Sequence, residues 1–469
     1  MRKTKIICTL GPAVEKDGVL EKLILNGLNI ARFNFSHGSH EEHKGRVDLV
    51  RNASKNVGLP VALLLDTKGP EIRTGKFGPK EVTLVEGQEF TLINEEILGD
   101  ETKVSVSYKE LYKDVEKGCS ILINDGLIEL EVLEIVGKDI RCKVLNGGVL
   151  SNNKGINVPN VVINLPALTE KDRADILFAV ENDYDFIAAS FVRKADDVRA
   201  IKKILDDNNS KIKVIAKIEN RQGLDNVDEI LEVADGIMVA RGDLGVEIPV
   251  YEVPVAQKMI IKKCNEVGKI VVVATQMLDS MIKNPRPTRA EASDVANAVY
   301  DGTSAIMLSG ESAAGKYPAQ TVAIMNSIAT NTEKSINYWK RFAETKTIVN
   351  PTIIDSIAHG ACQVAKDADA KVIITHTTNQ DAVRAICKFK PNCDIIATTC
   401  DEKIYRQLIL AWGVHPVLVA EGTSKEEILR IAKREAIKLG LANEMDLSLV
   451  VGEEQGTIKS ITFEDIRLN

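Results

Sequence analysis

Short apolar runs recur along the chain, and each is followed by a stretch with the spacing of an amphipathic helix. The runs are rich in Val and Ile and nearly continuous, which is typical of parallel strands buried on both faces. They span residues 5–10, 29–35, 61–66, 186–192, 214–219, 236–243, 270–275 and 305–310. Helical stretches between them include 171–182, 195–208, 226–234, 255–267 and 290–300. Strand–helix units of this number predict a (β/α)8 TIM barrel, whose active site forms at the C-terminal ends of the strands.

Two other segments do not belong to the barrel: one interrupts the series of strands, and the other follows it. Residues 67–185 separate the third and fourth strands, and short strands are predicted within them at 81–85, 89–93, 120–124, 128–136, 140–144 and 157–159, with turns at 125–126 and 147–148. After about residue 345, helices again alternate with strands, as in an open α/β sheet. We therefore predict a barrel domain over 1–70 and 167–345, an inserted small β-barrel over 71–166, and a C-terminal α/β domain over 346–469. The insertion lies over the active-site face and is expected to act as a mobile lid.

Composition limits the kind of protein this is. The chain has 469 residues, of which 44% are hydrophobic and 27% charged, as in a folded multidomain protein. Its net charge of -7 argues against a nucleic-acid partner, and no apolar run approaches the length of a membrane span. The N-terminal apolar stretch is too short for a signal peptide, and the eight cysteines form no CxxC pair. We expect a cytoplasmic protein with reduced thiols.

Polar residues follow six of the predicted barrel strands where each strand ends. One such residue is common at any surface, but six on one barrel indicate a functional site. They are Arg32, Asn34 and Ser36; Asp66, Thr67 and Lys68; Lys217 and Glu219; Arg241 and Asp243; Thr275; and Ser309 and Glu311.

Two carboxylates stand out among these residues. Glu219 and Asp243 follow neighbouring strands, and two hard oxygen ligands with open positions suit Mg²⁺ that also binds substrate. Lys217 alternates in phase with Glu219, so both side chains point to one face, where a cation could stabilise developing negative charge. A structural ion pair is the alternative. The glycine-containing turn Ala240, Arg241, Gly242 and Asp243 could bind an anion through its backbone N–H groups.

Other candidates carry weaker signals. Arg32, Arg73 and Lys154 could neutralise phosphates, although each, taken alone, is better explained as a solvated surface residue. The series His37, His40 and His43 suggests a metal site, but Ser39 and Glu42 favour a capped helix start instead. Three C-terminal cysteines, Cys387, Cys393 and Cys400, lack zinc-ligand spacing.

Several long stretches give the chain a resemblance to a known family. They include ARFNFSHG at 31–38, LDTKGPEIRT at 65–74, IAKIEN at 215–220 and ATQMLDSM at 274–281. On these the chain resembles the pyruvate kinase family over nearly its whole length. The family's architecture, a barrel with an inserted β lid and a C-terminal α/β domain, agrees with the prediction above.

The resemblance implies phosphoryl transfer from phosphoenolpyruvate to ADP. It implies that Glu219 and Asp243 hold Mg²⁺ (or Mn²⁺) and that Thr275 lies near the carbon that is protonated. It also implies that Lys217 stabilises the charge on the phosphoryl group and the enolate, and that Arg32 contacts the phosphoryl group. The implied roles of the remaining residues are substrate binding for Ala240, Arg241, Gly242 and Asp243, nucleotide binding for Asn34, His37, Arg73 and Lys154, and K⁺ binding for Asn34, Ser36, Asp66 and Thr67. A homotetramer is also implied.

Departures from the family pattern affect regulation more than chemistry. Ser304, Ser312 and Asn160 replace commoner residues, but none carries a predicted role. Segment 377–382 lacks the Ser-Gly pair and final hydroxyl of the sugar-phosphate effector loop, and Asp381 adds a negative charge there. The second effector loop, 452–456, carries two more acids. We therefore predict no activation by fructose 1,6-bisphosphate.

Two rival functions remain open from the sequence. One is a lyase or aldolase of the phosphoenolpyruvate/pyruvate barrel group, which should lack the β lid and the K⁺ ligands. The other is a catalytically silent relative that acts as a binding module. Loss of Lys217, Glu219, Asp243 or Thr275 would favour this second function, and all four are present.

Overall fold

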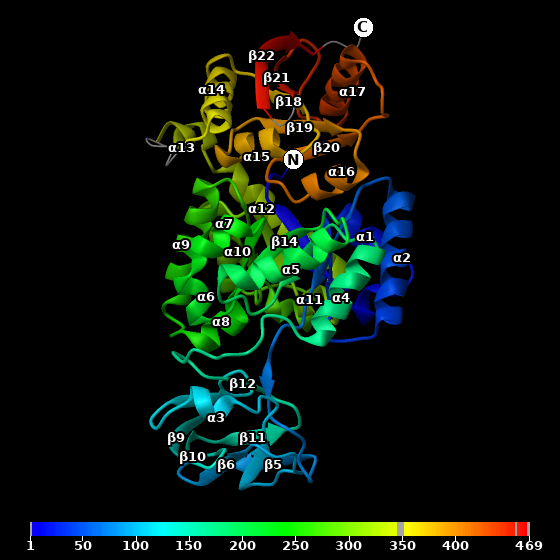
Figure 1. The fold of residues 1–469 in the computed structure, drawn as a ribbon. Helices are drawn as coiled ribbons and strands as arrows, with labels where there is room; N and C mark the ends of the chain where they lie inside the picture. The colour runs from blue at the N-terminus through cyan, green and yellow to red at the C-terminus, as the bar shows by residue number, and fades with distance from the viewer. Residues whose placement is uncertain (1, 345–350, 455–456, 467–469) are drawn as a thin grey trace.

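The computed structural model describes residues 2–344, 351–454 and 457–466, which form three bodies stacked along one axis (Figure 1). The barrel lies in the middle, with the inserted β domain at one end and the C-terminal domain at the other. The boundary predicted at residue 345 and residues 455–456 of the second effector loop lie outside the described residues. Within the described ranges, no helix is long and apolar enough to cross a membrane.

Parallel strands close into the predicted barrel, in the order β1-β17-β16-β15-β14-β13-β3-β2. Their bounds are β1 Lys5–Thr9, β2 Ile30–Asn34, β3 Ala62–Asp66, β13 Phe186–Ala189, β14 Lys213–Ile218, β15 Gly236–Ala240, β16 Ile270–Ala274 and β17 Ala305–Leu308. Neighbouring strand residues enter different apolar clusters: Leu64 packs inside the barrel, whereas Leu63 and Leu65 pack outward against the helices. Burial on both faces explains the continuous apolar runs and confirms the predicted fold class.

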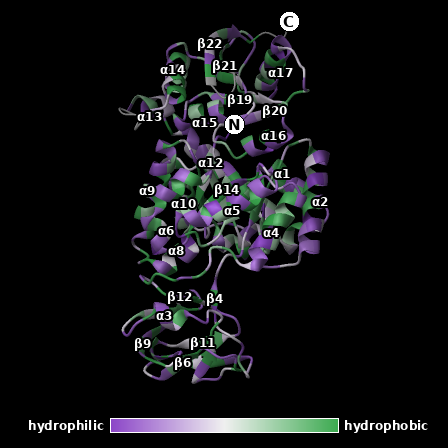
Figure 2. Cartoon of the chain, viewed as in Figure 1, coloured by the Kyte–Doolittle hydropathy of each residue, from purple (hydrophilic) through white to green (hydrophobic). Residues whose placement is uncertain are grey.

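Helices surround the barrel, and the longer ones present apolar residues to it. The longer ones are α1 Val19–Leu25, α2 His40–Val57, α4 Glu170–Glu181, α5 Ala195–Asp207, α7 Val227–Val233, α9 Val253–Glu266, α10 Arg289–Asp301 and α12 Pro318–Lys334. The shorter ones are η1 Pro12–Val14, α6 Arg221–Asp225, α8 Arg241–Glu247, η2 Asp279–Ile282 and α11 Gly310–Ala313. In α2, for example, Val47, Val50 and Ala53 are buried at helical spacing, while the rest of the helix is largely hydrophilic (Figure 2).

The histidine series belongs to the start of α2. The Ser39 hydroxyl accepts a hydrogen bond from the Glu42 backbone N–H, and the Glu42 carboxylate accepts one from the Ser39 N–H. This capping box confirms the predicted helix start. The His43 Nε2 donates to the His37 carbonyl oxygen at 2.8 Å, and His40 bonds elsewhere. In the described part of the chain, no group of three or more His, Cys, Asp or Glu is arranged to hold a metal.

The inserted domain is built on a mixed sheet in the order β4-β12-β8-β9-β10-β6-β7, with the pair β11-β5 beside it. The bounds are β4 Ile72–Arg73, β5 Glu81–Leu84, β6 Glu89–Ile93, β7 Lys103–Ser105, β8 Ser120–Ile123, β9 Ile128–Val136, β10 Asp139–Asn146, β11 Gly148–Ser151 and β12 Gly155–Asn157, with helix α3 at Leu111–Asp114. Its two edges meet: the Gly75 N–H donates to the Ser105 carbonyl oxygen at 2.7 Å, and the Ser107 N–H donates to that of Arg73 at 2.9 Å. These bonds close the sheet into the small β-barrel that was predicted.

Two details of this domain differ from the prediction. The strand expected at 157–159 is wrong, because β12 ends at Asn157 and Pro159 has no N–H for a sheet hydrogen bond. Strands β4, β7 and β11 were not predicted, since two to four residues are too few to show a period. Asn160, where the family often has Gly, has a φ of +61°, a conformation that Asn tolerates better than most residues.

The C-terminal domain is the predicted open sheet, in the order β20-β19-β18-β21-β22, with β22 antiparallel to β21. Its elements are α13 Tyr338–Glu344, α14 Ile353–Asp367, β18 Val372–His376, α15 Asp381–Lys388, β19 Asp394–Thr399, α16 Glu402–Leu408, β20 Val414–Leu418, α17 Lys425–Lys438, β21 Leu447–Glu454 and β22 Thr457–Asp465. Helix α16 ends at Leu408, and Ile409 and Leu410, which follow it, pack into the apolar cluster of the barrel interior.

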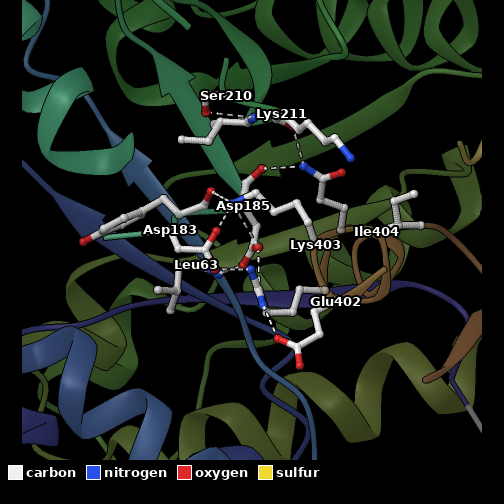
Figure 3. A network of polar contacts seen from close by, with 12 residues as sticks. Leu63, Asp183, Asp185, Ser210, Lys211, Glu402, Lys403 and Ile404 are labelled. Carbon is white, nitrogen blue, oxygen red and sulfur yellow. Dashed lines mark hydrogen bonds and ion pairs between the residues drawn. The ribbon is translucent and has the colours of Figure 1, made fainter. Parts of the chain in front are cut away.

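An ionic network joins α16 to the barrel at the N-terminal end of β13, opposite the inserted domain (Figure 3). The Arg406 Nε lies 2.8 Å from the Asp185 carboxylate, and the Lys403 Nζ lies 2.6 Å from that of Asp183. Asp185 is fully buried and also accepts the Leu63 backbone N–H. Burial raises the pKa of Asp185, and Arg406 and Lys403 act against that rise. The charge of Asp185 therefore depends on the C-terminal domain.

Candidate active site

A cavity of about 1070 Å³ separates the C-terminal ends of the barrel strands from the inserted domain. His37 and Asp243 line it from the barrel, and Arg73 and Lys154 line it from the inserted domain. Four residues with predicted roles thus face one space from two domains. Asn34, the other residue implied in nucleotide binding, is not among the lining residues of this cavity.

Lys217 lies at the centre of a buried ionic cluster beside this cavity. Its Nζ is 2.9 Å from Asp66 Oδ1, 2.9 Å from Glu219 Oε1 and 2.7 Å from the Ser190 hydroxyl. Burial works against the charge on Lys217, but Asp66 and Glu219 outweigh it and raise its pKa above the ordinary lysine value. Lys217 is therefore a cation throughout the physiological pH range.

Arg32 meets the same cluster from β2. Its Nε lies 2.7 Å from Asp66 Oδ2, and its Nη1 donates to the Thr9 hydroxyl at 2.7 Å. Burial opposes the charge on Asp66, yet Arg32 and Lys217 lower its pKa. Asp66 thus holds two cations side by side at the ends of β2 and β14.

Ser190 is a member of the cluster that the sequence did not identify. Its hydroxyl lies within hydrogen-bonding distance of the Lys217 Nζ and the Thr67 carbonyl oxygen, the latter at 2.6 Å. The predicted strand ran through to residue 192, which placed Ser190 inside it, whereas β13 ends at Ala189. The sequence did contain a sign of this strand end, because Ser190 is a polar residue within an otherwise continuous apolar run.

Glu219 and Asp243 form the candidate metal site. Glu219 Oε2 accepts the backbone N–H of Phe191, whose φ of +55° turns it toward the carboxylate. Burial, against the lowering effect of Lys217 and with a further rise from Asp243, raises the pKa of Glu219 to about 7. A buried carboxylate beside a second acid is stabilised by added positive charge, so this donor set fits a hard divalent cation. Substrate and water oxygens would complete such a site.

The residues implied in K⁺ binding gather at the ends of β2 and β3. Asn34 is the register partner of Asp66, and the Asn34 side-chain oxygen accepts the Ser36 N–H at 3.1 Å. The Thr67 carbonyl oxygen accepts the Ser190 hydroxyl. All four implied ligands, Asn34, Ser36, Asp66 and Thr67, therefore lie in one corner, and oxygen is the ligand type that K⁺ requires.

Thr275 and the turn after β15 face each other across neighbouring strand ends. The Thr275 hydroxyl accepts the Gly242 backbone N–H at 2.8 Å and donates to the Ala274 carbonyl oxygen at 2.6 Å. Arg241 does not point toward the cavity as a substrate ligand would; its guanidinium bonds the loop that follows β16. Of the turn predicted to bind an anion, the Gly242 N–H is thus already paired.

Comparisons with known proteins agree with this geometry. The family description "Pyruvate kinase, barrel domain" matches residues 1–322, and "Pyruvate kinase, alpha/beta domain" matches residues 355–461. The chain belongs to the pyruvate kinase family.

Relatives and a solved structure extend this result. A pyruvate kinase from Clostridium acetobutylicum is 51% identical over 452 residues, which cover 96% of each chain. One from Staphylococcus aureus is 48% identical over 96% of this chain and 77% of its own. The crystal structure of a pyruvate kinase from Cryptosporidium parvum matches with a TM-score of 0.96 and 40% identity, over 99% of this chain and 96% of that one.

The resemblance expected from the sequence is therefore confirmed, together with its function. The chain is a phosphotransferase that transfers the phosphoryl group of phosphoenolpyruvate to ADP, giving pyruvate and ATP. The lyase or aldolase alternative is wrong. Two departures from the pyruvate kinase pattern are structural: the Ser304 hydroxyl accepts the Val271 N–H, and the Ser312 hydroxyl donates to the Thr9 carbonyl oxygen.

Proposed function

We propose that this transfer takes place at Lys217, with Glu219 and Asp243 holding Mg²⁺ (or Mn²⁺). The observation that supports the proposal most is the buried contact of Lys217 with both Glu219 and Asp66. Asp243, the other proposed metal ligand, lines the cavity. The divalent ion, when bound, supplies positive charge at the oxygens of substrate and phosphoryl group. Lys217 remains protonated and stabilises the charge on the phosphoryl group and on the enolate, which is electrostatic rather than covalent catalysis.

The neighbouring residues orient phosphoenolpyruvate. Arg32 contacts the phosphoryl group, since its second guanidinium edge is not used by Asp66. The turn formed by Ala240, Arg241, Gly242 and Asp243 binds the substrate carboxylate through its backbone, with the Gly242 N–H holding the turn against Thr275. Thr275 lies next to the carbon that is protonated. The contact between the Thr275 hydroxyl and the Gly242 N–H supports placing these two functions side by side.

A monovalent ion completes the site in this proposal. Asn34, Ser36, Asp66 and the Thr67 carbonyl bind K⁺, supported by their convergence at the ends of β2 and β3. The ion would add positive charge near the phosphoryl group without donating hydrogen bonds.

ADP binds in the cavity between the barrel and the inserted domain. Arg73 and Lys154 of the inserted domain and His37 of the barrel line it and meet the nucleotide. Asn34 is the fourth nucleotide contact in this proposal, although it does not line the cavity itself. The Arg73 Nε bonds Glu71 at 2.7 Å and its Nη1 bonds the Asn153 carbonyl oxygen at 2.8 Å, so its orientation is set before nucleotide binds. Because these ligands come from both domains, movement of the inserted domain would open and close the nucleotide site.

Fructose 1,6-bisphosphate does not activate the enzyme in this proposal. Both carboxylate oxygens of Glu453 are buried beside segment 377–382. Burial raises the pKa of Glu453, and the nearby Asp381 raises it further. The Thr377 hydroxyl and the Thr378 N–H lower this pKa, although neither has the geometry of a full hydrogen bond to the carboxylate. A carboxylate thus already faces the donors that an effector phosphate would use, and a second acid repels it.

The enzyme is proposed to be a cytoplasmic homotetramer with no nucleic-acid or membrane partner. Val250, Tyr251 and Val255 support self-association, because 75%, 76% and 69% of their surfaces are exposed close together after α8. Sedimentation of the purified chain would measure the oligomeric state directly.

The test of the proposed site is a lactate dehydrogenase-coupled assay with phosphoenolpyruvate, ADP, Mg²⁺ and K⁺. Binding of Mn²⁺, followed by electron paramagnetic resonance, supplies a second readout that does not depend on turnover. We expect activity to require both ions, and Glu219→Gln and Asp243→Asn each to weaken Mn²⁺ binding. Glu229→Gln, which removes a carboxylate remote from the cluster, is the matched control. Unchanged Mn²⁺ binding in both site variants would contradict the metal assignment.

A further inference from the structure

The backbone at Thr275 is strained. Thr275 has a φ of +69° and Gln276 a φ of +53°, so two successive residues other than glycine adopt the left-handed conformation. This conformation is unfavourable for L-residues, and most so for a β-branched one such as Thr. It persists only where the surroundings hold it, and such strain is concentrated at functional sites.

The Arg241 guanidinium holds this strained segment. Its Nε donates to the Ala274 carbonyl oxygen at 3.2 Å and its Nη2 to the Thr275 carbonyl oxygen at 2.7 Å. Its Nη1 pairs with the Asp294 carboxylate at 2.7 Å. The two carbonyl groups bonded by Arg241 therefore flank the residue whose backbone is strained, while Asp294 of α10 fixes the guanidinium itself.

The hydroxyl of Thr275 is fixed as a consequence. It lies between the Ala274 carbonyl oxygen, which it bonds at 2.6 Å, and the Gly242 N–H, which it accepts at 2.8 Å. Arg241 and Gly242 are consecutive in α8, so one turn of chain fixes both the backbone and the hydroxyl of Thr275. A lysine at position 241 could not bond both carbonyls and Asp294 in this planar geometry.

The far side of the loop is held separately. The buried carboxylate of Glu311 accepts the Leu278 N–H at 3.1 Å and the Ser309 N–H at 2.7 Å. Glu311 therefore fixes the return of the loop to the barrel, whereas Arg241 acts at the strained residues themselves. The loop would remain attached to the barrel if the Arg241 contacts were lost.

We infer that Arg241 is a positioning residue for proton transfer: its guanidinium holds Thr275 in the left-handed conformation that presents the hydroxyl to the substrate carbon. The inference rests on the proposed role of Thr275. It gives the side chain of Arg241 a function distinct from the backbone contact with the substrate carboxylate.

The test measures proton transfer apart from phosphoryl transfer. Exchange of the methyl protons of pyruvate in D₂O, with Mg²⁺, K⁺ and ATP present, is followed by NMR for the wild type, Arg241→Lys, Thr275→Ala and the double variant. We expect each single variant to slow exchange by about 10²-fold, the scale on which a small misplacement of a reacting group acts. The KM for phosphoenolpyruvate should change much less than the exchange rate. In the Thr275→Ala background, Arg241→Lys should have almost no further effect.

The outcomes separate the inference from the proposed function. Wild-type exchange in Thr275→Ala would reject the role of Thr275 itself. If exchange is slow in Thr275→Ala, two results would overturn the positioning role of Arg241. One is an additive effect of the two substitutions in the double variant, and the other is a wild-type exchange rate in Arg241→Lys. If Arg241→Lys does not fold, Asp294→Asn loosens the same guanidinium and should slow exchange to a smaller extent. Arg199→Lys, whose guanidinium pairs with Asp196 on the exposed side of α5, is the control and should exchange at the wild-type rate.

Discussion

The Asn157 amide donates a hydrogen bond to Glu247 Oε1 at 2.8 Å, and this contact joins the inserted domain to the barrel. Asn157 ends β12, the strand that follows Lys154, and Glu247 ends α8, the helix that carries Asp243. Burial raises the pKa of Glu247 despite the opposing effect of Asn157, with a further rise from Asp243. The contact thus links the segment proposed to bind nucleotide with the segment proposed to bind metal and substrate.

Loss of this contact should weaken ADP binding. In Asn157→Ala the KM for ADP is expected to rise by about three- to tenfold, since one hydrogen bond contributes roughly 1 kcal/mol. The KM for phosphoenolpyruvate, which is bound by the barrel, should change less. Steady-state titration of each substrate measures both. Asn146→Ala is the control, because the Asn146 amide bonds the Leu127 carbonyl oxygen within the inserted domain. Equal shifts in the two variants would show that the Asn157–Glu247 contact has no special role.

Lys217→Met should abolish most turnover without unfolding the barrel. Losing one group aimed at the transition state typically lowers the rate by about 10²–10³-fold. The coupled assay measures kcat, and circular dichroism reports the fold. Lys171→Met is the matched control: Lys171 also pairs with a buried carboxylate, Asp175, at the same end of the barrel. Wild-type turnover in Lys217→Met would show that the assigned role is wrong.

The enzyme is expected to be activated by K⁺ and much less by Na⁺. In the family that this chain resembles, Glu at the position of Glu71 accompanies K⁺ dependence and Lys accompanies independence. Glu71→Lys should partly release the requirement, because an ammonium group could replace the charge of the ion. Glu71 also pairs with Arg73 at 2.6 Å, so the same variant should raise the KM for ADP.

Glu71→Gln separates these two effects. It removes the negative charge that orients Arg73 but adds no cation, so it should raise the KM for ADP and leave the K⁺ requirement intact. Rates are measured across a K⁺ series in a buffer free of other small cations. Equal rates of the wild type with and without K⁺ would reject the monovalent site.

Fructose 1,6-bisphosphate at millimolar concentration should leave the half-saturation for phosphoenolpyruvate unchanged. The measurement is a substrate titration with and without the sugar phosphate. Glu453→Gln removes the carboxylate that faces segment 377–382, leaves Asp381 in place, and is expected to allow weak binding of inorganic phosphate, detectable by calorimetry. A several-fold shift in the wild type would show that this segment binds the effector despite its acids.

The link between the barrel and the C-terminal domain should contribute strongly to stability. Arg406→Met leaves the buried Asp185 short of positive charge, which is expected to cost about 3 kcal/mol. Urea unfolding followed by the fluorescence of Trp339 and Trp412 measures the loss. Arg430→Met removes an exposed pair with Glu427 in the same domain and should cost less than about 1 kcal/mol. Similar losses in the two variants would mean that the network at Asp185 adds no more than a surface pair.

The amino-acid sequence alone determined the barrel and most of its polar strand ends. Continuous apolar runs specify strands buried on both faces, and parallel strands in a closed barrel bring their C-terminal ends together. Lys217 and Glu219 could be assigned to one face because alternation along a strand is local and has a period of two residues. Thr275 and Asp243 were identified instead because they follow the ends of two predicted strands.

Which side chains meet across those ends depends on how the strands and the domains pack together. Ser190 joins Lys217 because β13 stops three residues earlier than its apolar run suggested. The long side chain of Arg241 turns away from the cavity to the backbone at Thr275. A guanidinium group has five N–H donors, and no local sequence pattern predicts which acceptors they will bond. Asn157 and Glu247 meet across the cavity because the inserted domain packs against the closed barrel. Ninety residues separate them in the chain, so no periodicity of the sequence could predict their contact.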